Sequence, residues 1–321
     1  RVFEAYGRAL QGRGHFDDGR EAFEKGLEIA ENCQDPVVIG RLWANLGTNA
    51  MEQGRHARAI ACHQKALSLF RQAGNLRLEG RALYFEGLHG LLLGDPIRAG
   101  HALEQALSLH KKTGDRRYEA MCRCEMGRLH ASYSRLDEAK RHLVTALRLH
   151  RAVDNPRQEA RTRLHLAKLA IQQGREAKAL HHIGAGLRLA QEVRDRRTEA
   201  DLVEESGLIH VERGRFDQGQ ELLLTALAVH RATADPCKEG LAECRLAALD
   251  ALGGHIDVAE QRMHDGQKKL ADIDDDSLAG ARALYQAALD IVYQLHAQNA
   301  GDGEKASHHH QNWQDRVWQA S

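Results

Sequence analysis

The sequence predicts an all-α fold, a right-handed α-solenoid of seven helical hairpins closed by one further helix. Three observations support this prediction. A 40-residue period runs without insertion from Arg1 to about Asp275. Apolar residues recur with helical spacing on both sides of a short turn in each unit. The 321 residues also include only 4 prolines and 5% aromatic residues. Such a chain grows by adding units rather than by enlarging one core.

The unit from Gly40 to Asn75 shows the repeat most fully. Its small residues and its turn glycine return along the chain, Gly47 as Gly7, Gly87, Gly127 and Gly207, and Gly54 as Gly14, Gly94, Gly174, Gly214 and Gly254. The pair Ala66–Leu67 returns as Ala–Leu or Gly–Leu in every unit except the last. Small side chains let the two helices of a hairpin approach closely, and the leucines fill the space beside them.

Each hairpin has recognisable helix ends. Gly54 lies in a Gln-Gly-Arg-His turn and can take the left-handed conformation that ends a helix. Aspartate or asparagine stands before the next first helix, where it suits an N-cap, at Asp35, Asn75, Asp115, Asn155, Asp195 and Asp235. Three prolines follow at early-helix positions, where a missing N–H costs nothing: Pro36, Pro156 and Pro236.

The repeats occupy residues 1–275. Residues 276–300 predict a capping helix that covers the last apolar face, and residues 301–321 form a tail that can hold a short helix. Trp313 and Trp318 give that tail an apolar edge, which either packs as a cap or docks on a partner or in the groove. The chain lacks an initiator Met and begins inside a helical pattern, so we expect it to be part of a longer protein.

This pattern resembles the tetratricopeptide repeat, whose signature positions are matched by Trp43, Leu46, Gly47, Gly54, Ala59, Ala66 and Leu67. The period is 40 rather than about 34, which is similar to the longer repeats of kinesin light chain and of bacterial regulator sensor domains. Peptide-controlled response-regulator phosphatases have similar long repeats. HEAT and armadillo repeats have comparable lengths but would not be expected to show this small-residue pattern. The resemblance implies a binding scaffold.

Catalytic and cofactor motifs are missing from the sequence, which contains no phosphate-binding loop, no dinucleotide fingerprint and no His-Glu-x-x-His. We therefore expect no enzyme activity and no cofactor. The 20 histidines do not predict a metal site, because His110, His150 and His230 share one position at second-helix ends. There a partly protonated ring would interact well with the helix dipole. The six cysteines share no repeat position, which predicts free, buried thiols.

Charge and hydropathy limit the location and the partners. Lys+Arg equals Asp+Glu at 45 each, so no global charge draws the chain to nucleic acid or to a membrane surface. The sequence shows neither a signal peptide nor an apolar run near the roughly 20 residues that span a bilayer. We expect a cytoplasmic protein that has no membrane partner.

The resemblance also implies which residues bind a ligand. In the family, first helices line the concave face, and positions 2, 5, 6, 9 and 12 counted from Gly40 contact the ligand. Carried onto this chain, these positions indicate Arg41, Asn45, Thr48, Arg81, Tyr84, Phe85, Glu125, Arg128, Arg161, His165, Lys168, Asp201, Glu204 and Glu205. Asn45 matches the asparagine that similar proteins use against a peptide backbone.

The charges on this face favour an acidic or bipolar ligand. Arginine recurs at position 2, and a guanidinium pairs bidentately with a carboxylate. Residues 115–165 carry 12 Lys/Arg against 7 Asp/Glu, a net of +5, whereas residues 195–240 carry 6 against 10, a net of −4. A bipolar groove would orient an extended peptide or a helix. The alternative is a set of ordinary solvated helix faces with i,i+4 partners.

These observations favour a non-catalytic protein- or peptide-binding module, the sensor or scaffold part of a larger bacterial signalling protein. Its partner can also be another domain of the same chain. Two alternatives stay open. One is the solenoid body of a peptide-regulated phosphatase-like enzyme, and the other is weak nucleic-acid binding through the basic fourth and fifth repeats.

Overall fold

The computed structural model describes residues 2–233 and 236–271, and throughout that part the chain is built from α-helical hairpins. The predicted all-α repeat fold is confirmed. The predicted capping helix at 276–300 and the tail with Trp313 and Trp318 lie outside the described residues. The chain divides into two compact units, Arg1–Val153 and Asp154–Ser321, called unit 1 and unit 2 below.

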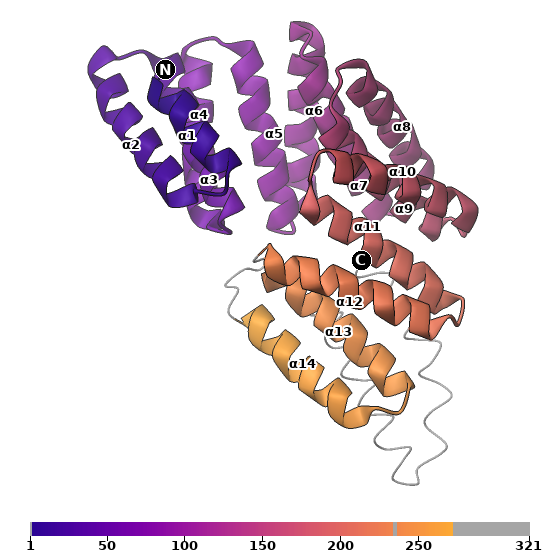
Figure 1. Cartoon of the computed structure of the whole chain (residues 1–321). Helices are drawn as coiled ribbons and strands as arrows, with labels where there is room; N and C mark the ends of the chain where they lie inside the picture. The colour runs from indigo at the N-terminus through magenta and orange to yellow at the C-terminus, as the bar shows by residue number, and fades with distance from the viewer. Residues whose placement is uncertain (1, 234–235, 272–321) are drawn as a thin grey trace. The chain divides into compact units, whose positions relative to one another are not determined.

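Unit 1 contains four hairpins (Figure 1), formed by α1 (Val2–Gly12), α2 (Phe16–Cys33), α3 (Pro36–Glu52), α4 (His56–Gln72), α5 (Leu76–Leu92), α6 (Pro96–Thr113), α7 (Arg116–Ser132) and α8 (Leu136–Ala152). The described part of unit 2 contains α9 (Pro156–Gln172), α10 (Glu176–Glu192), α11 (Arg196–Glu212), α12 (Phe216–Ala232), α13 (Pro236–Leu252) and α14 (Ile256–Ala271). Odd-numbered helices are called first-type helices, and even-numbered helices are called second-type helices.

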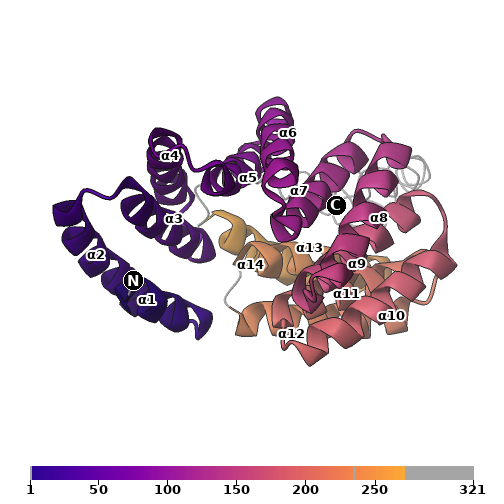
Figure 2. The same ribbon diagram turned by 90° about the horizontal axis from the view of Figure 1, so that it is seen from above.

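The first-type and second-type helices of unit 1 form two layers. In Figure 2, α3, α5 and α7 lie on one side of this unit, and α4, α6 and α8 lie on the other. Contacts join α1 to α3 and α5 to α7, in addition to those within each hairpin. The first-type helices thus form one layer of unit 1, and the resemblance predicts that the ligand binds on this layer.

Helix ends follow the residues that favour them. Asp35 accepts hydrogen bonds from the backbone N–H groups of Val37 and Val38, and Asp115 accepts one from Tyr118. Asn155 occupies the N-cap of α9 as predicted, although its side chain makes no cap bond. Asp235 lies outside the described residues. Asp95, which the repeat pattern missed, caps α6 through the N–H of Arg98.

The hairpin turns require a left-handed residue. Gly54 has φ +70°, as its place in the turn predicts. Ser134 occupies the equivalent place in the fourth repeat and takes φ 56°. A non-glycine residue adopts this conformation at a steric cost, which shows how strongly the repeat fixes the turn.

Small residues set the distance between the helices of a hairpin. A Cβ atom built on Gly127 would lie 2.6 Å from Cγ of Leu143. A Cβ atom on Gly90 would lie 2.8 Å from the backbone N of Ala99. The close approach inferred from the repeat is therefore present, and the leucines of the second-type helices fill it.

The buried histidines correct one prediction. His110, His150 and His230 lie in the last turns of their helices, as predicted, but they have 1% or less of their surface exposed and belong to the core. The His110 ring packs on Gly80, whose built Cβ would lie 2.9 Å from Cε1. Burial lowers the pKa of His110. The prediction of free, buried thiols is confirmed for Cys62, Cys122 and Cys244; Cys124 is buried as well, whereas Cys237 is only half-buried.

No helix of the described residues is long and apolar enough to cross a membrane.

Candidate functional site

The predicted ligand-binding residues of unit 1 lie on three of its first-type helices. We call this set the unit-1 face: Arg41, Asn45 and Thr48 on α3, Arg81, Tyr84 and Phe85 on α5, and Glu125 and Arg128 on α7. Arg128 is exposed, and five others are half-buried. Tyr84 and Glu125 are buried, with 3% and 2% of their surface exposed.

Arg41 binds a carboxylate of the preceding repeat. Its Nη2 lies 2.7 Å and its Nε 3.1 Å from Oε1 of Glu4, a residue of α1 that is 5% exposed. The Asn45 amide also reaches that oxygen, at 3.5 Å. Thr48 turns its hydroxyl to the Ala44 carbonyl of its own helix, at 3.0 Å. Glu4 therefore organises Arg41 and Asn45 beside one another.

Arg81 is held in the same way by the following repeat. Its Nη2 lies 2.8 Å from Oδ2 of Asp115, which also accepts from Nε of Arg77 at 2.9 Å. Burial would raise the pKa of Asp115, but the two arginine hydrogen bonds outweigh it and lower that pKa to about 2. The guanidinium also stacks over the Tyr118 ring, 4.7 Å from its centroid. Asp115 thus caps a helix and orients two arginines.

The two predicted aromatic residues of α5 pack against rings on neighbouring helices. Tyr84 packs edge-on against Tyr118 with ring centroids 5.7 Å apart, and Phe85 stacks on His63 at 4.2 Å. Arg128 lies 2.9 Å from the carboxylate of Glu125, one turn before it on α7. Because Glu125 is buried, we place it beneath Arg128 as a partner rather than as a surface that meets a ligand directly.

The predicted acidic residues of unit 2 are paired with basic residues of adjacent repeats. Lys168 on α9 pairs with Glu205 on α11 at 3.1 Å, and Lys238 on α13 pairs with Asp201 at 2.9 Å. Arg245 on α13 pairs with Glu204. Burial would raise the pKa values of Asp201 and Glu204, but the neighbouring cations lower them. Arg161 is exposed and His165 is half-buried on α9.

These pairs correct the bipolar reading of the charges. The acidic residues expected at one end of a groove are matched by cations of adjacent repeats: Asp201, Glu204 and Glu205. The partners lie one repeat away instead of four residues away along the same helix. The net charge counted from the sequence therefore overestimates how strongly these carboxylates would attract a charged ligand.

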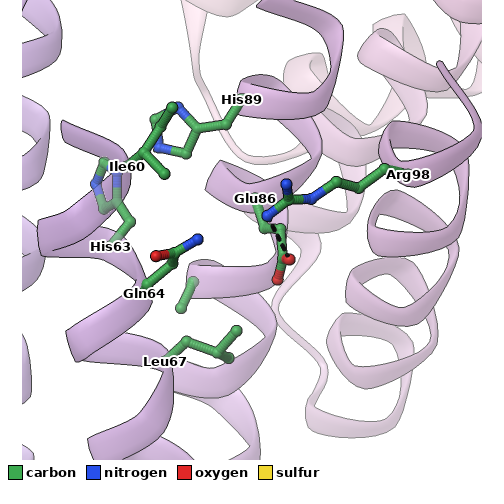
Figure 3. Close-up of a pocket in the computed structure, with 8 residues that line it drawn as sticks. Ile60, His63, Gln64, Leu67, Glu86, His89 and Arg98 are labelled. Carbon is green, nitrogen blue, oxygen red and sulfur yellow. Dashed lines mark hydrogen bonds and ion pairs between the residues drawn. The ribbon is translucent and has the colours of Figure 1, made fainter. Parts of the chain in front are cut away.

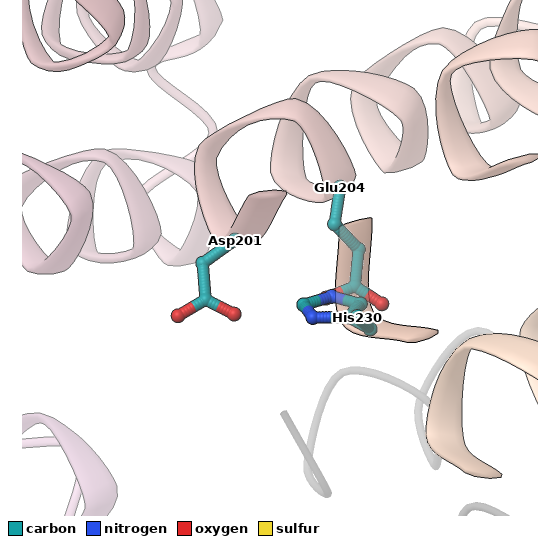
Figure 4. Close-up of side chains that lie close together, drawn as sticks. All are labelled: Asp201, Glu204 and His230. Atoms are coloured by element: carbon teal, nitrogen blue, oxygen red, sulfur yellow. The ribbon is translucent and has the colours of Figure 1, made fainter. Parts of the chain in front are cut away.

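Asp201, Glu204 and His230 lie close enough to hold a cation, with one donor atom from each within 4.8 Å of the others (Figure 4). Their chemistry argues against that use. Asp201 already binds Lys238, Glu204 already binds Arg245, and the His230 Nε2 lies 3.9 Å from Glu204. A divalent ion would have to displace two ammonium or guanidinium partners. We therefore interpret the group as an ion-pair network in which Glu204 and Arg245 are buried and Asp201 and Lys238 are partly exposed.

A small pocket in unit 1 contains a histidine pair that sequence reasoning missed. It is lined by Ile60, His63, Gln64, Leu67, Ala82, Glu86, His89 and Arg98 (Figure 3). Nδ1 of His63 and Nε2 of His89 are 2.9 Å apart. Burial and the neighbouring ring lower the pKa of His63 to about 3. Burial, with the charges of His56 and Arg98, lowers the pKa of His89 to about 4.

The repeat itself contained a signal for this pair. The position of His63 is otherwise apolar and buried in every repeat, as Phe23, Leu103, Leu143, Ile183, Leu223 and Met263. A single histidine at a repeat position that is otherwise apolar and buried indicates a buried ring that needs a polar partner. The position of His89 is Leu169, Ile209 or Leu249 in later repeats.

The histidine pair is expected to make unit 1 less stable in acid. Both folded-state pKa values lie below the value of about 6.5 for an unfolded histidine, so the unfolded state binds more protons. Stability is therefore full above pH 6.5 and falls as the pH drops toward 4. Between pH 7 and pH 5 the pair should account for a loss of about 2 to 4 kcal/mol.

Urea denaturation at both pH values checks this expectation. The matched variant is His63→Leu/His89→Leu, which places at both positions a residue that the repeat uses elsewhere. It should lose less stability than the natural chain between pH 7 and pH 5. Equal losses would show that other groups cause the acid sensitivity.

Comparisons with known proteins agree with the repeat architecture. Residues 40–72 match the family model described as tetratricopeptide repeat. No curated protein matches the sequence. A Rap protein complexed with Competence and Sporulation Factor is similar in structure, with a TM-score of 0.70 and 15% identity, over 100% of this chain and 98% of that chain.

Two further solved structures are similar. One is the Rap conjugation gene regulator of plasmid pLS20 in complex with the Phr* peptide, with a TM-score of 0.61 and 15% identity, covering 93% of this chain and 75% of that one. The other is a signal transduction ATPase with a tetratricopeptide repeat sensor from Pyrococcus horikoshii, with a TM-score of 0.57 and 13% identity. It matches 98% of this chain and 49% of its own length. At these identities the likeness establishes a shared fold.

Proposed function

We propose that this chain, a helical repeat protein of the tetratricopeptide-repeat superfamily, is a module that binds a peptide or an extended protein segment on the unit-1 face. Two of the similar structures are complexes, one with Competence and Sporulation Factor and one with the Phr* peptide. That likeness supports the class of ligand. The position on this chain is argued from its own residues.

The observation that carries the proposal is the combination of partly exposed donors on neighbouring repeats. Asn45 offers an amide that can both donate and accept, as a peptide backbone requires. Arg128 is exposed two repeats further along, and Phe85 of the intervening repeat is half-buried. Such a row of amide, aromatic and guanidinium groups suits an extended chain that presents backbone groups and alternating side chains.

The carboxylates that already bind Arg41 and Arg81 limit the charge of the ligand that this face would favour. Glu4 and Asp115 already supply carboxylates to Arg41 and Arg81. A guanidinium has five N–H donors, so each arginine can add a ligand oxygen while keeping its own partner. We infer that the ligand carries few carboxylates and that its backbone carbonyls meet these arginines. A strongly acidic ligand is less well matched.

The wider role that we propose is a sensor or scaffold in a cytoplasmic bacterial signalling or regulatory protein. Peptide binding would then be read out by another domain or protein. The module itself would act by binding, since its predicted residues are donors, acceptors and apolar contacts rather than an activated nucleophile or base.

A selection from a library of short random peptides tests the proposal. The natural chain should retain a set of peptides that share a sequence preference. Asn45→Ala and Arg128→Ala should each weaken the affinity for those peptides roughly ten- to hundredfold, the effect of losing one hydrogen bond to a backbone or charged group. Fluorescence anisotropy measures the change.

The matched control is Arg148→Ala, which removes an exposed arginine from the second-type helix α8 of the same unit. It should leave the affinity unchanged. Peptides that bind equally to all variants would move the site away from the unit-1 face. Failure to select any peptide would contradict the proposal.

A further inference from the structure

Three positions of each first-type helix normally pack on the preceding second-type helix. The first of these is buried in every later repeat, at 3% exposure or less, as Leu42, Ala82, Cys122, Thr162, Leu202 and Ala242. The second lies four residues on and is buried as Leu46, Met126, Leu166 and Leu246, with Glu86 and Ser206 half-buried. The third lies three residues further and is buried as Asn49, His89, Leu169, Ile209 and Leu249, with Leu129 half-buried.

The same three positions are exposed on α1. They are Val2, Tyr6 and Ala9, which follow one another at i, i+4 and i+7 and so form one stripe of the helix. Val2 is 80% exposed and Tyr6 is 58% exposed, and Ala9 is also exposed. We call this stripe the α1 face. It has the residue types of a helix interface, and the described residues place no helix on it.

The chain itself shows what covers such a face. Between α2 and α3, a Cβ atom on Gly26 would lie 3.1 Å from Cδ2 of Leu42. Between α10 and α11, a Cβ atom on Gly186 would lie 2.9 Å from Cδ1 of Leu202. The covering helix therefore presents a glycine or alanine at the point of contact, and a leucine follows it, as Leu27 and Leu187 do here. The small residue makes room for the side chain from the first-type helix.

We propose that the α1 face binds an amphipathic helix of the second type, one that carries Gly-Leu or Ala-Leu where it crosses Val2 and Tyr6. The face continues the series of interfaces that α2–α3, α4–α5 and α6–α7 already form within unit 1. The second-type helices of these interfaces show which residues the helix that binds the α1 face should carry. This surface is separate from the unit-1 face, whose residues lie on α3, α5 and α7.

An extended chain tests this directly. A copy of residues 16–40 placed before Arg1 supplies a second-type helix in the correct phase, because Gly40 precedes Arg41 and Arg41 is equivalent to Arg1. The added helix should slow amide hydrogen exchange in α1 by about tenfold or more, since it buries the valine and tyrosine side chains. Mass spectrometry measures the exchange.

The matched control is the same extended chain with Val2→Glu and Tyr6→Glu, which places two charges in the new interface. Its α1 should exchange at the rate of the chain without the extension. Because both side chains are exposed, the two substitutions should leave the circular dichroism spectrum of the unextended chain unchanged.

Two results would overturn the proposal. One is an extension that leaves exchange in α1 unchanged, or slows it equally in the doubly substituted control. The other is a dimer of the unextended chain, seen by sedimentation and abolished by Val2→Glu. That dimer would assign the α1 face to a second copy of the chain instead of to a second-type helix.

Discussion

Replacing Gly90 with leucine is expected to lower the free energy of unfolding by about 3 kcal/mol, the upper part of the range for overpacking. A Cβ atom at this position would lie 2.8 Å from the backbone N and 2.9 Å from Cα of Ala99. Backbone atoms cannot rotate away as a flexible side chain can. Helices α5 and α6 must therefore move apart, which also loosens the contacts of their other residues. Urea denaturation followed by circular dichroism measures the loss.

The matched control is Gly100→Ala in the same hairpin. A Cβ atom on Gly100 would meet only Cδ2 of Leu129, at 3.4 Å, which is an ordinary contact. Alanine should then raise stability by about 0.5 to 1 kcal/mol, because glycine is the poorer helix former. If Gly90→Leu were tolerated as well as Gly100→Ala, close helix approach would not be what fixes the hairpin.

Removing Arg245 should have an effect of similar size on unit 2. Arg245→Met leaves Glu204, which is 2% exposed, without its guanidinium partner. Breaking a buried ion pair from one side typically costs about 3 to 5 kcal/mol. We expect the lower end here, since Lys238 also attracts Glu204 and lowers its pKa. Thermal and urea denaturation at neutral pH measure the effect.

The loss should depend on pH with a defined sign. In the natural chain the folded-state pKa of Glu204 is lowered, so the pair contributes stability above the unfolded value of about 4.3 and loses it as the pH falls through the lowered value. The difference between natural chain and variant should therefore be largest near pH 7 and shrink below about pH 4. Arg213→Met, which removes an exposed partner of Glu176, should cost less than about 1 kcal/mol. Equal losses for the two variants would contradict a buried network.

The fold was predictable because its determinants are local and repeat every 40 residues. Gly54 and its equivalents end helices through their own backbone freedom, and Asp35 and Asp115 cap helices two or three residues away. Gly127 and its equivalents indicate where the two helices of one hairpin pack closely together. Each of these signals needs no information about neighbouring repeats. Asn155 is likewise the N-cap of α9, but the sequence does not reveal that its side chain makes no cap bond.

The site was less predictable because its chemistry depends on what adjacent repeats place opposite each residue. Arg41, Glu204 and Glu205 look like ordinary exposed charges in sequence, yet their partners lie about 40 residues away, on the first-type helix of a neighbouring repeat. The position of a charged residue in the repeat predicts which face of its helix it occupies. It does not predict which residue of the neighbouring repeat forms an ion pair with it. The histidines show the same limit, since His63 is a core residue at a position that the other repeats fill with apolar side chains, and His110 is buried together with its equivalents His150 and His230.

Hydrogen exchange with a selected peptide bound is the measurement that tests the central claim, that the unit-1 face is the binding surface. Amides of α3, α5 and α7 should become more protected, while those of α4 and α6 on the other layer should change little. Arg128→Ala should reduce the protection at the same peptide concentration. Protection confined to the second-type helices, or to unit 2, would contradict the account.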